Sequence, residues 1–571
     1  MRWVISQTNP DCVRLLTEAL GVSSRVAHLL ATRGLTDPER AGRFLSPRLD
    51  HLHDPLLMRD MPRAVARLSR AIELQEKVLI YGDYDVDGTM AAVVLLAALR
   101  AQGARVDVHI PDRFADGYGM RASVIERAAQ EGARLIVSVD NGIREHPAFA
   151  RMKELGIDGI VTDHHLPEAL LPDAHAILNP RRPGCEYPEK NLAGAGVAFK
   201  LAQALMGARF SEAVLRSYLK LVAIGSIADV VPLTGENRVI AHYGLAGLTQ
   251  SARSLAASSP GRAGLSALLA VAGLEGKTVS AGDVAFRLAP RLNAAGRMGN
   301  ARHVIELFSR SAEDGVREVA LRLDELNASR QRSEHEIVTA IREQMKLRPE
   351  LRDRFTLVFA GDGWHRGVIG IAAQRIAEQF HRPTLVISTE NGAAHGSGRS
   401  IRGFHLLEAL TRSRPLFDRV GGHAQAAGFS LPAASIQQLE QQFECHARSV
   451  LTPADLEPEL RIDSAISLDD VSRELLAEIK RIEPFGCGNP SPVFSAEARL
   501  ASPPRVLKEK HLKLWLAGSK RKFSAIGWGM AGYAAALEGR GRLSLAFSIA
   551  ENTFDGVTDL QLELKDVRPA D

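Results

Sequence analysis

The chain lacks the sequence features that define membrane, secreted and zinc-binding proteins. Its longest apolar runs, such as residues 91–99, are much shorter than the roughly 18 residues that span a membrane. Residues 1–14 contain no signal-peptide core. The four cysteines are widely separated and form no CxxC pair: Cys12, Cys185, Cys445 and Cys487. We therefore expect reduced thiols in a cytoplasmic protein with no membrane partner.

Neither sign of charge dominates, and aromatic residues are few. The 571 residues include 71 Lys and Arg against 67 Asp and Glu, and aromatic residues make up 5%. A net charge of +4 does not by itself indicate a nucleic-acid partner, so any basic binding surface must be local. Hydrophobic residues at 45% and charged residues at 24% are ordinary for a folded protein of several domains.

The pattern of apolar segments predicts two α/β regions followed by a small β-barrel. In the first region strands alternate with helices, as in a parallel sheet: strands 78–81, 106–110, 135–139, 159–162 and 176–178, with helices 90–101, 122–130 and 147–155. The second region contains strands 355–359 and 384–387 and helix 369–380. We expect a helical segment at 1–70, a parallel-sheet domain at 71–315, a charged connecting helix at 316–350, a second α/β domain at 351–452 and the β domain at 453–571.

Three carboxylates follow the first predicted strand, at Asp83, Asp85 and Asp87. Because like charges this close repel one another, the cluster is costly unless cations neutralise it. An EF-hand calcium loop is one interpretation, but its twelfth position requires a Glu and is Val94 here. The position directly after a strand also argues against a helix–loop–helix motif.

Further acidic and imidazole side chains follow other apolar segments. They are Asp140 after strand 135–139, the run Asp163-His164-His165 after strand 159–162, and Asp229. Each alone is most often a helix cap or a structural residue, but parallel strands bring their carboxyl ends to one edge of the sheet. Together these groups suit Mg²⁺ or Mn²⁺, and a bridging carboxylate can hold two such ions about 3.5–4 Å apart for phosphoester hydrolysis. We expect Asp140 to be the bridge.

The two adjacent histidines should have different roles. Neighbouring side chains point to opposite sides where the chain is extended. We therefore expect one of them to bind metal, favour His164, and assign His165 to substrate phosphate or to support of a ligand.

The motifs together resemble the DHH phosphoesterase superfamily. Asp163-His164-His165 with the Asp-rich motif is similar to its signature, and Gly421-Gly422-His423-Ala424-Gln425-Ala426-Ala427-Gly428-Phe429 is similar to that of the associated DHHA1 domain. Their order most resembles the RecJ family of bacterial single-strand-specific 5′→3′ exonucleases. The resemblance implies an α/β fold, with a parallel-sheet DHH domain and a smaller α/β DHHA1 domain joined by a long helix, plus a C-terminal OB-like β-barrel.

The resemblance also implies roles for individual residues. Two divalent cations, Mn²⁺ or Mg²⁺, would be bound by Asp85, Asp87, Asp140, His164 and Asp229, with Asp83 and His165 at nearby catalytic positions. The DNA 5′ phosphate would contact Arg113, Ser397, Arg399 and His423, and Arg291 and Arg297 would guide the strand. The alternatives are an ordinary turn at 396–400 and surface salt bridges for the last two arginines.

A basic stretch near the C-terminus predicts a surface for single strands. Residues 501–526 contain one acid, Glu509, and seven cations: Arg505, Lys508, Lys510, Lys513, Lys520, Arg521 and Lys522. In segment 511–516 the leucines share one strand face, while His511, Lys513 and Trp515 share the other. Such a face offers charge for phosphates and a ring for stacked bases. The alternative is a solubilising face with Trp515 packed under a loop, and we expect Phe523 and Trp528 in the core.

Together with the acidic cluster and the basic β domain, the resemblance implies a metal-dependent enzyme that degrades single-stranded DNA from the 5′ end to 5′-mononucleotides, in DNA recombination and repair. The strand would thread between the two α/β domains through a channel too narrow for duplex. The family implies a single-strand-binding protein and a helicase as partners, and we expect a monomer. Two alternatives are a DHH nanoRNase or pyrophosphatase for small substrates, and a non-catalytic single-strand-binding scaffold. The first kind of chain is shorter and lacks the basic β domain, whereas the second would lack metal residues.

Overall fold

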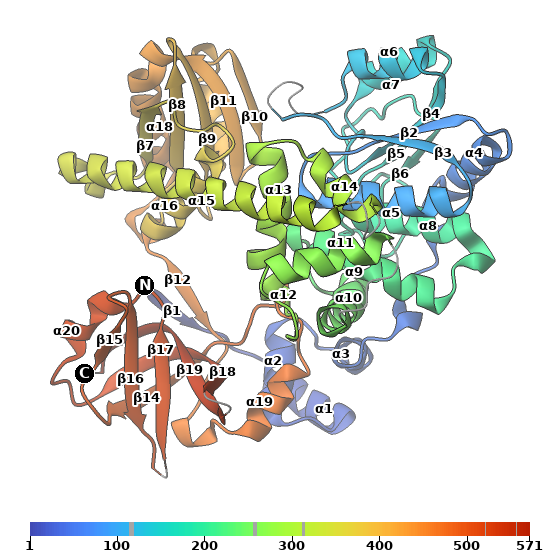
Figure 1. Cartoon of the computed structure of the whole chain (residues 1–571). Helices are drawn as coiled ribbons and strands as arrows, with labels where there is room; N and C mark the ends of the chain where they lie inside the picture. Colours follow the sequence, from blue (N-terminus) through green and yellow to red (C-terminus); the bar gives the residue numbers. More distant parts are fainter. Residues whose placement is uncertain (114–118, 255–259, 311–314, 520, 555–556, 571) are drawn as a thin grey trace. The chain divides into compact units, whose positions relative to one another are not determined.

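The structure is a computed structural model that describes residues 1–113, 119–254, 260–310, 315–519, 521–554 and 557–570 (Figure 1). It divides into two compact units. The larger unit comprises residues 3–293, 301–320 and 461–571, and the smaller unit comprises residues 1–2, 294–300 and 321–460.

A five-stranded sheet at the centre of the larger unit carries the acidic motifs. Its strand order is β3-β2-β4-β5-β6, and all neighbouring strands run parallel. The strands are β2 (Lys77–Tyr81), β3 (Arg105–His109), β4 (Ala133–Val139), β5 (Asp158–Thr162) and β6 (Ala176–Leu178). The predicted parallel sheet is therefore confirmed.

Helices cover both faces of this sheet, as buried parallel strands require. Helix α5 (Val86–Ala101) is buried on nearly all sides and packs against α8 (Gly194–Met206) and α9 (Glu212–Ala228). On the other face, α6 (Ala122–Gln130) and α7 (His146–Glu154) share an apolar cluster with the strands. The remaining helices of this region are α4 (Met61–Glu73), α10 (Gly235–Arg253), α11 (Pro260–Val271), α12 (Ala281–Asp283), α13 (Ala289–Met298) and α14 (Arg302–Ser309).

The long helix α15 (Val316–Leu347) leads into a second, mixed sheet in the smaller unit. Its strand order is β10-β11-β9-β8-β7, and only β7 and β8 run parallel. The strands are β7 (Leu357–Asp362), β8 (Thr384–Glu390), β9 (Ala393–Arg399), β10 (Arg419–Gly422) and β11 (Ala426–Pro432), with helices α16 (Ile369–Phe380), α17 (Leu406–Arg412) and α18 (Ile436–Val450). Because β9 extends through Arg399, the interpretation of residues 396–400 as an ordinary turn is wrong.

The C-terminal strands close into a barrel. The strand order is β13-β14-β18-β19-β17-β16-β15, and an additional pairing of β14 with β16 completes the closure. The elements are β12 (Glu459–Ile462), β13 (Ser464–Ala465), α19 (Arg473–Lys480), β14 (Phe494–Leu500), β15 (Arg505–Leu507), β16 (His511–Ala517), β17 (Lys522–Gly527), α20 (Ala534–Leu537), β18 (Leu543–Phe554) and β19 (Val557–Pro569). This closed, mainly antiparallel arrangement is OB-like, as predicted.

The N-terminal helices complete the core of this barrel. Buried residues of the N-terminal segment, such as Leu16 and Leu29, belong to the same apolar cluster as Leu512 and Phe547 of the barrel. The N-terminal elements are β1 (Arg2–Ile5), α1 (Pro10–Leu20), α2 (Ser24–Thr32) and α3 (Pro38–Leu45). Helix α3 is capped at its start by Asp37, which accepts a hydrogen bond from the backbone N–H of Arg40.

All four cysteines are free, as expected. In the described part of the chain, no helix combines the length and apolar character that would let it cross a membrane.

Candidate active site

The predicted acidic and imidazole residues meet at the carboxyl edge of the parallel sheet. His164 Nε2 lies 3.1 Å from Asp140 Oδ1, 3.7 Å from Asp229 Oδ2 and 3.8 Å from Asp87 Oδ2. The described chain holds three overlapping groups whose possible ligand atoms lie within 4.8 Å of one another: Asp140, His164 and His165; Asp87, His164 and Asp229; and Asp83, Asp85 and Asp140. The structure thus brings together all seven residues that the sequence assigned to catalysis.

Asp140 is held in a strained conformation at the centre of these groups. Its φ of 62° lies in the left-handed region that non-glycine residues rarely adopt. Its backbone N–H donates to the carbonyl of Thr162 at 2.9 Å, which fixes the turn after β4. Its Oδ1 is buried and accepts no hydrogen bond from the described residues, although His164 Nε2 lies in ion-pair distance of it. Asp140 also belongs to two of the three groups. A buried carboxylate oxygen in this state calls for a cation, so these residues would fit a divalent metal ion.

Close backbone packing holds the carboxylate of Asp87. It accepts hydrogen bonds from the backbone N–H groups of Gly194 at 2.5 Å and Ala195 at 3.0 Å, at the start of α8. A helix N-terminus favours negative charge. A Cβ on Gly194 would lie 2.6 Å from Asp140 Oδ1, and a Cβ on Gly225 would lie 2.8 Å from Asp87 Oδ1. These supporting glycines were missed from the sequence, where only the Gly194-Ala195-Gly196 run hinted at close packing.

Asp85 shows that the helix-cap interpretation and the metal interpretation are compatible. Its Oδ1 accepts a hydrogen bond from the N–H of Gly88 at 2.9 Å and so caps α5. A Cβ on Gly88 would lie 2.6 Å from the Cβ of Asp83. The cap and this glycine thus bring all three carboxylates of the first motif into one tight turn.

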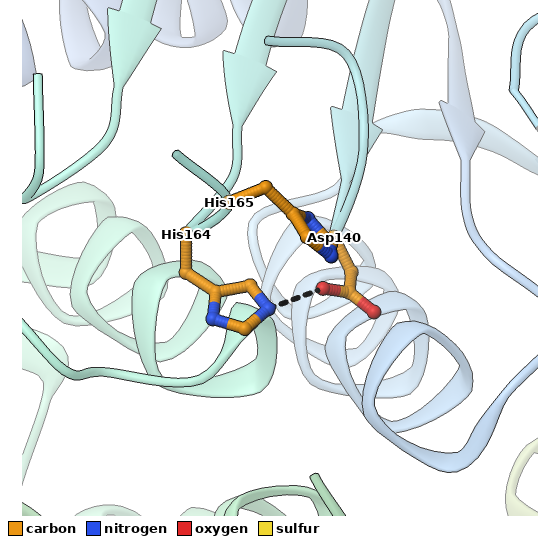
Figure 2. A group of neighbouring side chains, drawn as sticks. All are labelled: Asp140, His164 and His165. Atoms are coloured by element: carbon orange, nitrogen blue, oxygen red, sulfur yellow. Dashed lines mark ion pairs between the residues drawn. The ribbon is translucent and has the colours of Figure 1, made fainter. Parts of the chain in front are cut away.

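The two histidines lie on the same side, so the expectation that they point to opposite sides is wrong. Their ring centres are 4.5 Å apart, and both rings lie beside Asp140 (Figure 2). The reason is that β5 ends at Thr162, so the histidines are no longer part of an extended strand. Asp163, for which we predicted no catalytic role, accepts a hydrogen bond from His165 Nδ1 at 2.7 Å and another from the N–H of Ile143 at 3.0 Å.

Burial and mutual repulsion perturb the titration of the whole cluster. Burial, reinforced by neighbouring carboxylates, raises the pKa of Asp87 to about 7 and the pKa values of Asp83 and Asp229 to about 8. Burial lowers the pKa of His164 to about 4, which leaves the neutral imidazole that metals bind. Burial opposes charge on His165 as well, but its hydrogen bond to Asp163 and the charges of the nearby carboxylates together outweigh burial and raise the pKa of His165 to about 9.

Arg113 lies near the acidic motif. Its guanidinium is 5.1 Å from the ring centre of Tyr84. Its positive charge lowers the pKa of Asp83 and so offsets part of the rise that burial causes. The residues that follow, 114–118, lie outside the described part of the chain.

Ser397, Arg399 and His423 lie close together in the smaller unit. Ser397 and Arg399 share one face of β9, and Arg399 Nη1 donates to Ser397 Oγ at 3.1 Å. A Cβ on Gly370, in the first turn of α16, would lie 2.9 Å from Ser397 Oγ and 3.1 Å from Arg399 Nη2. His423 is exposed, and its N–H donates to the carbonyl of Ala426, the residue that pairs with Arg399 across the sheet. A helix N-terminus, a hydroxyl and a guanidinium together suit an anion.

Comparison with known proteins identifies the family. Residues 77–226 match the model of the DHH family, N-terminal domain, residues 353–445 the DHHA1 domain and residues 462–566 the RecJ OB domain. The chain is 37% identical over 570 residues to the single-stranded-DNA-specific exonuclease RecJ of Bacillus subtilis, covering 99% of this chain and 70% of that protein. It is 34% identical to RecJ of Salmonella typhimurium, covering 95% of each. The chain belongs to the RecJ family.

A solved RecJ structure shares the whole fold. RecJ from Thermus thermophilus in complex with Mn²⁺ matches with a TM-score of 0.84 at 30% identity, covering 100% of this chain and 80% of that one. A second structure of that protein, in complex with Mg²⁺, matches with a TM-score of 0.77. The predicted fold class and the family resemblance are both confirmed.

The two arginines of α13 make backbone contacts in this RecJ-family chain. Arg291 donates to the carbonyls of Arg287 at 2.7 Å and Val271 at 3.3 Å. Arg297 donates to the carbonyl of Gly367 at 3.2 Å. These bonds give both side chains a structural role, and guidance of a strand by them remains a prediction.

The barrel presents the predicted cationic and aromatic face. The leucines of β16 are buried, whereas Trp515 is 39% exposed, with Lys513 Nζ 5.6 Å from its ring centre. The interpretation of Trp515 as packed under a loop is therefore wrong. Lys508 and Lys510 are exposed in the turn before β16, and Lys520 lies outside the described residues.

Trp528 extends this face, although we expected it in the core. Phe523 is buried, as predicted, but Trp528 is 60% exposed. Because Leu512 pairs with Gly527, residue 528 lies opposite His511, and the two rings are 4.9 Å apart. The backbone N–H of Gly529 donates to His511 Nδ1 at 3.0 Å and holds the pair in place.

The pKa shifts of the cluster predict how metal affects stability. Carboxyl groups with raised pKa values keep protons that the unfolded chain has released, so the metal-free protein should lose stability as pH rises from about 7 to about 8.5. His165, with its raised pKa, acts in the same direction, and His164 is neutral in both states in this range. Mn²⁺ should therefore raise the melting temperature, and more at the higher pH. Thermal melts in EDTA and in Mn²⁺ at the two pH values test this. The prediction would be contradicted if Mn²⁺ did not raise the melting temperature of the parent protein, or if it raised that of Asp140→Asn by the same amount.

Proposed function

We propose that this RecJ-family chain is a divalent-metal-dependent exonuclease that degrades single-stranded DNA from its 5′ end and releases 5′-mononucleotides, in DNA recombination and repair. The observation that carries the proposal is the convergence of Asp87, Asp140 and Asp229 on His164, with distances of 3.1–3.8 Å. The relatives named as single-stranded-DNA-specific exonucleases support the choice of substrate.

Two Mn²⁺ or Mg²⁺ ions would be held by the ligands Asp85, Asp87, Asp140, His164 and Asp229. When bound, such ions polarise the phosphoryl group, activate water and stabilise charge on the leaving oxygen. Neighbouring residues hold these side chains in position. The N-terminus of α8 fixes Asp87 through two N–H groups, and Asp163 keeps His165 protonated and facing the cluster. A cationic His165 is suited to contact the phosphate oxygens of the substrate.

Ser397 and Arg399, with His423, would bind the terminal 5′ phosphate, and Arg113 would contact it as well. A terminal phosphate carries more negative charge than an internal phosphodiester, and Arg offers it a planar fork of donors. The convergence of Arg399, Ser397 and the first turn of α16 on one spot supports this assignment. Recognition of the end, rather than of the sequence, would set the polarity of degradation.

The barrel would hold the strand farther from its cut end. Trp515 and Trp528 offer exposed rings, and Lys508, Lys510 and Lys513 offer positive charge on or beside the same face. Stacking is tolerant of sequence because every base has a ring face. We also propose a monomeric cytoplasmic enzyme that works with a single-strand-binding protein and a helicase, as the family resemblance implies.

Replacement of Asp140 tests the proposal. Asp140→Asn removes the bridging charge, so hydrolysis of a single strand in Mn²⁺ should fall at least about a thousandfold, whereas affinity for the strand should change less than about threefold. The measurement is a time course on 5′- and 3′-labelled single strands, with binding followed by fluorescence anisotropy. Asp173→Asn, at an exposed carboxylate remote from the cluster, serves as the control and should cut at the normal rate.

The same assay separates the alternatives. A preference for long strands over dinucleotides supports the proposal, and the reverse preference would indicate a small-substrate phosphoesterase. Normal cutting by Asp140→Asn would refute the metal assignment.

Replacement of Trp528 tests the second stacking position. Loss of one base–aromatic stack costs about 1–3 kcal/mol, so Trp528→Ala should raise the Kd for a long single strand roughly fivefold or more. Hydrolysis of dinucleotides should not change if the barrel binds the strand away from the metal centre, as we propose. Phe286→Ala removes another highly exposed ring, outside the barrel, and should leave the Kd as it is. An unchanged Kd in Trp528→Ala would show that this ring does not bind the strand.

A further inference from the structure

A cavity of about 770 Å³ lies among helices of the larger unit. Its lining residues come from α5, α9, α10, α11 and α14. This volume is in the range of small-molecule binding sites. No residue of the candidate metal centre lines it.

The cavity is separate from the metal centre but shares two helices with it. Asp87 is in the first turn of α5 and Arg100 is near its other end, which at about 1.5 Å per residue places them roughly 20 Å apart. Lys220 lies on α9, the helix whose C-terminal end carries Asp229. A ligand in the cavity would therefore contact the two helices that position these metal-binding carboxylates.

The charged side chains among the described lining residues are all positive. They are Arg100, Arg216, Lys220 and Arg262, and the described lining contains no Asp or Glu. Arg216 is neutralised by Glu212 at 2.7 Å and lies over the ring of Tyr243. For the other three cations, no described carboxylate lies within the 4.0 Å of an ion pair.

Lys220 is a cation of this lining that is partly buried and has no described counter-charge. It is half-buried, and among the described residues its Nζ forms a hydrogen bond with the hydroxyl of Ser251 alone, at 3.5 Å. Its stem passes closely over α10, where a Cβ on Gly247 would lie 2.8 Å from Lys220 Cγ. Burial and the charge of Arg262 lower the pKa of Lys220. A partly buried ammonium without a counter-charge weakens the fold, so an anionic ligand would relieve this cost.

The walls of the cavity also offer apolar surface to a ligand. Besides the cations, they contain Leu221, Leu265, Phe308, Tyr218 and Tyr243. Inorganic phosphate would satisfy the charges but make no use of this apolar surface. A phosphate attached to a flat base satisfies both, since aromatic and apolar side chains pack against base rings.

We propose that this cavity binds a nucleoside 5′-monophosphate, with the phosphate on Lys220, Arg262 and Arg100 and the base against the apolar wall. The choice of ligand rests on the proposed function, because this is the class of product that the exonuclease reaction releases. Product that binds at this site when it accumulates would contact α5 and α9, the helices that hold Asp87 and Asp229.

Calorimetric titration of deoxyadenosine 5′-monophosphate into the full chain in EDTA tests the proposal. The Ser397→Ala/Arg399→Ala background removes the phosphate site proposed in the smaller unit. On that background we expect saturable binding at one site, with inorganic phosphate at least tenfold weaker. Lys220→Met/Arg262→Ala should raise the Kd at least tenfold. The exposed pair Arg40→Ala/Lys277→Met is the control and should not change it.

A second variant distinguishes loss of the site from misfolding of the protein. Ala97→Trp fills the cavity from an exposed position on α5 without removing a cation, and it should abolish binding while its melting temperature stays near that of the parent. Unsaturable binding, an unchanged Kd in both variants, or phosphate binding as tight as that of the nucleotide would overturn the proposal. Because the titration needs no hydrolysis, a failed exonuclease assay in Mn²⁺ would be a separate result.

Discussion

Repulsion among buried carboxylates is the constraint on which the rest of the catalytic domain depends. Asp83, Asp87, Asp140 and Asp229 are crowded at one edge of a sheet, where burial and mutual repulsion all disfavour their charged forms. Such a cluster is stable as charged groups only when cations are bound. The surrounding fold is adapted to this cluster in three ways. Asp140 has a strained left-handed backbone, glycines lie where the backbone packs closely against carboxylates, and the N-terminus of α8 donates hydrogen bonds to Asp87.

Different elements then handle different parts of the substrate. In the function that we propose, the parallel sheet would supply the groups for chemistry, the first turn of α16 and β9 would supply donors for a terminal phosphate, and the barrel would offer rings and lysines to the strand. The barrel is not an independent attachment to the larger unit, since its core is completed by α1, α2 and α3 from the other end of the chain. Arg238 strengthens this connection, because it is buried and donates to the carbonyls of Phe44 and Glu483.

Much of this could be predicted from the sequence because the signals are local. Apolar runs followed by Asp or His indicate both the strand and the edge at which its last side chain emerges, so the amino-acid order alone was enough to place Asp140 and His164 together. The alternation along β16 likewise predicted that Lys513 and Trp515 share the outer face.

What could not be predicted depends on contacts between distant segments or on the local path of the chain. The exposure of Trp528 follows from the register of β16 with β17, which sequence alone does not fix. The shared side of His164 and His165 follows from where β5 ends. The roles of Gly194 and Gly225 appear only when α8 and α9 are packed against the carboxylates, and the cationic cavity appears only when α9, α10 and α11 are assembled.

The most direct test of the central claim is anomalous diffraction at the manganese edge from crystals grown with Mn²⁺. The account predicts two peaks about 3.5–4 Å apart, with Asp140 between them and His164 bound to one. A single peak, or peaks that Asp140 does not bridge, would contradict it.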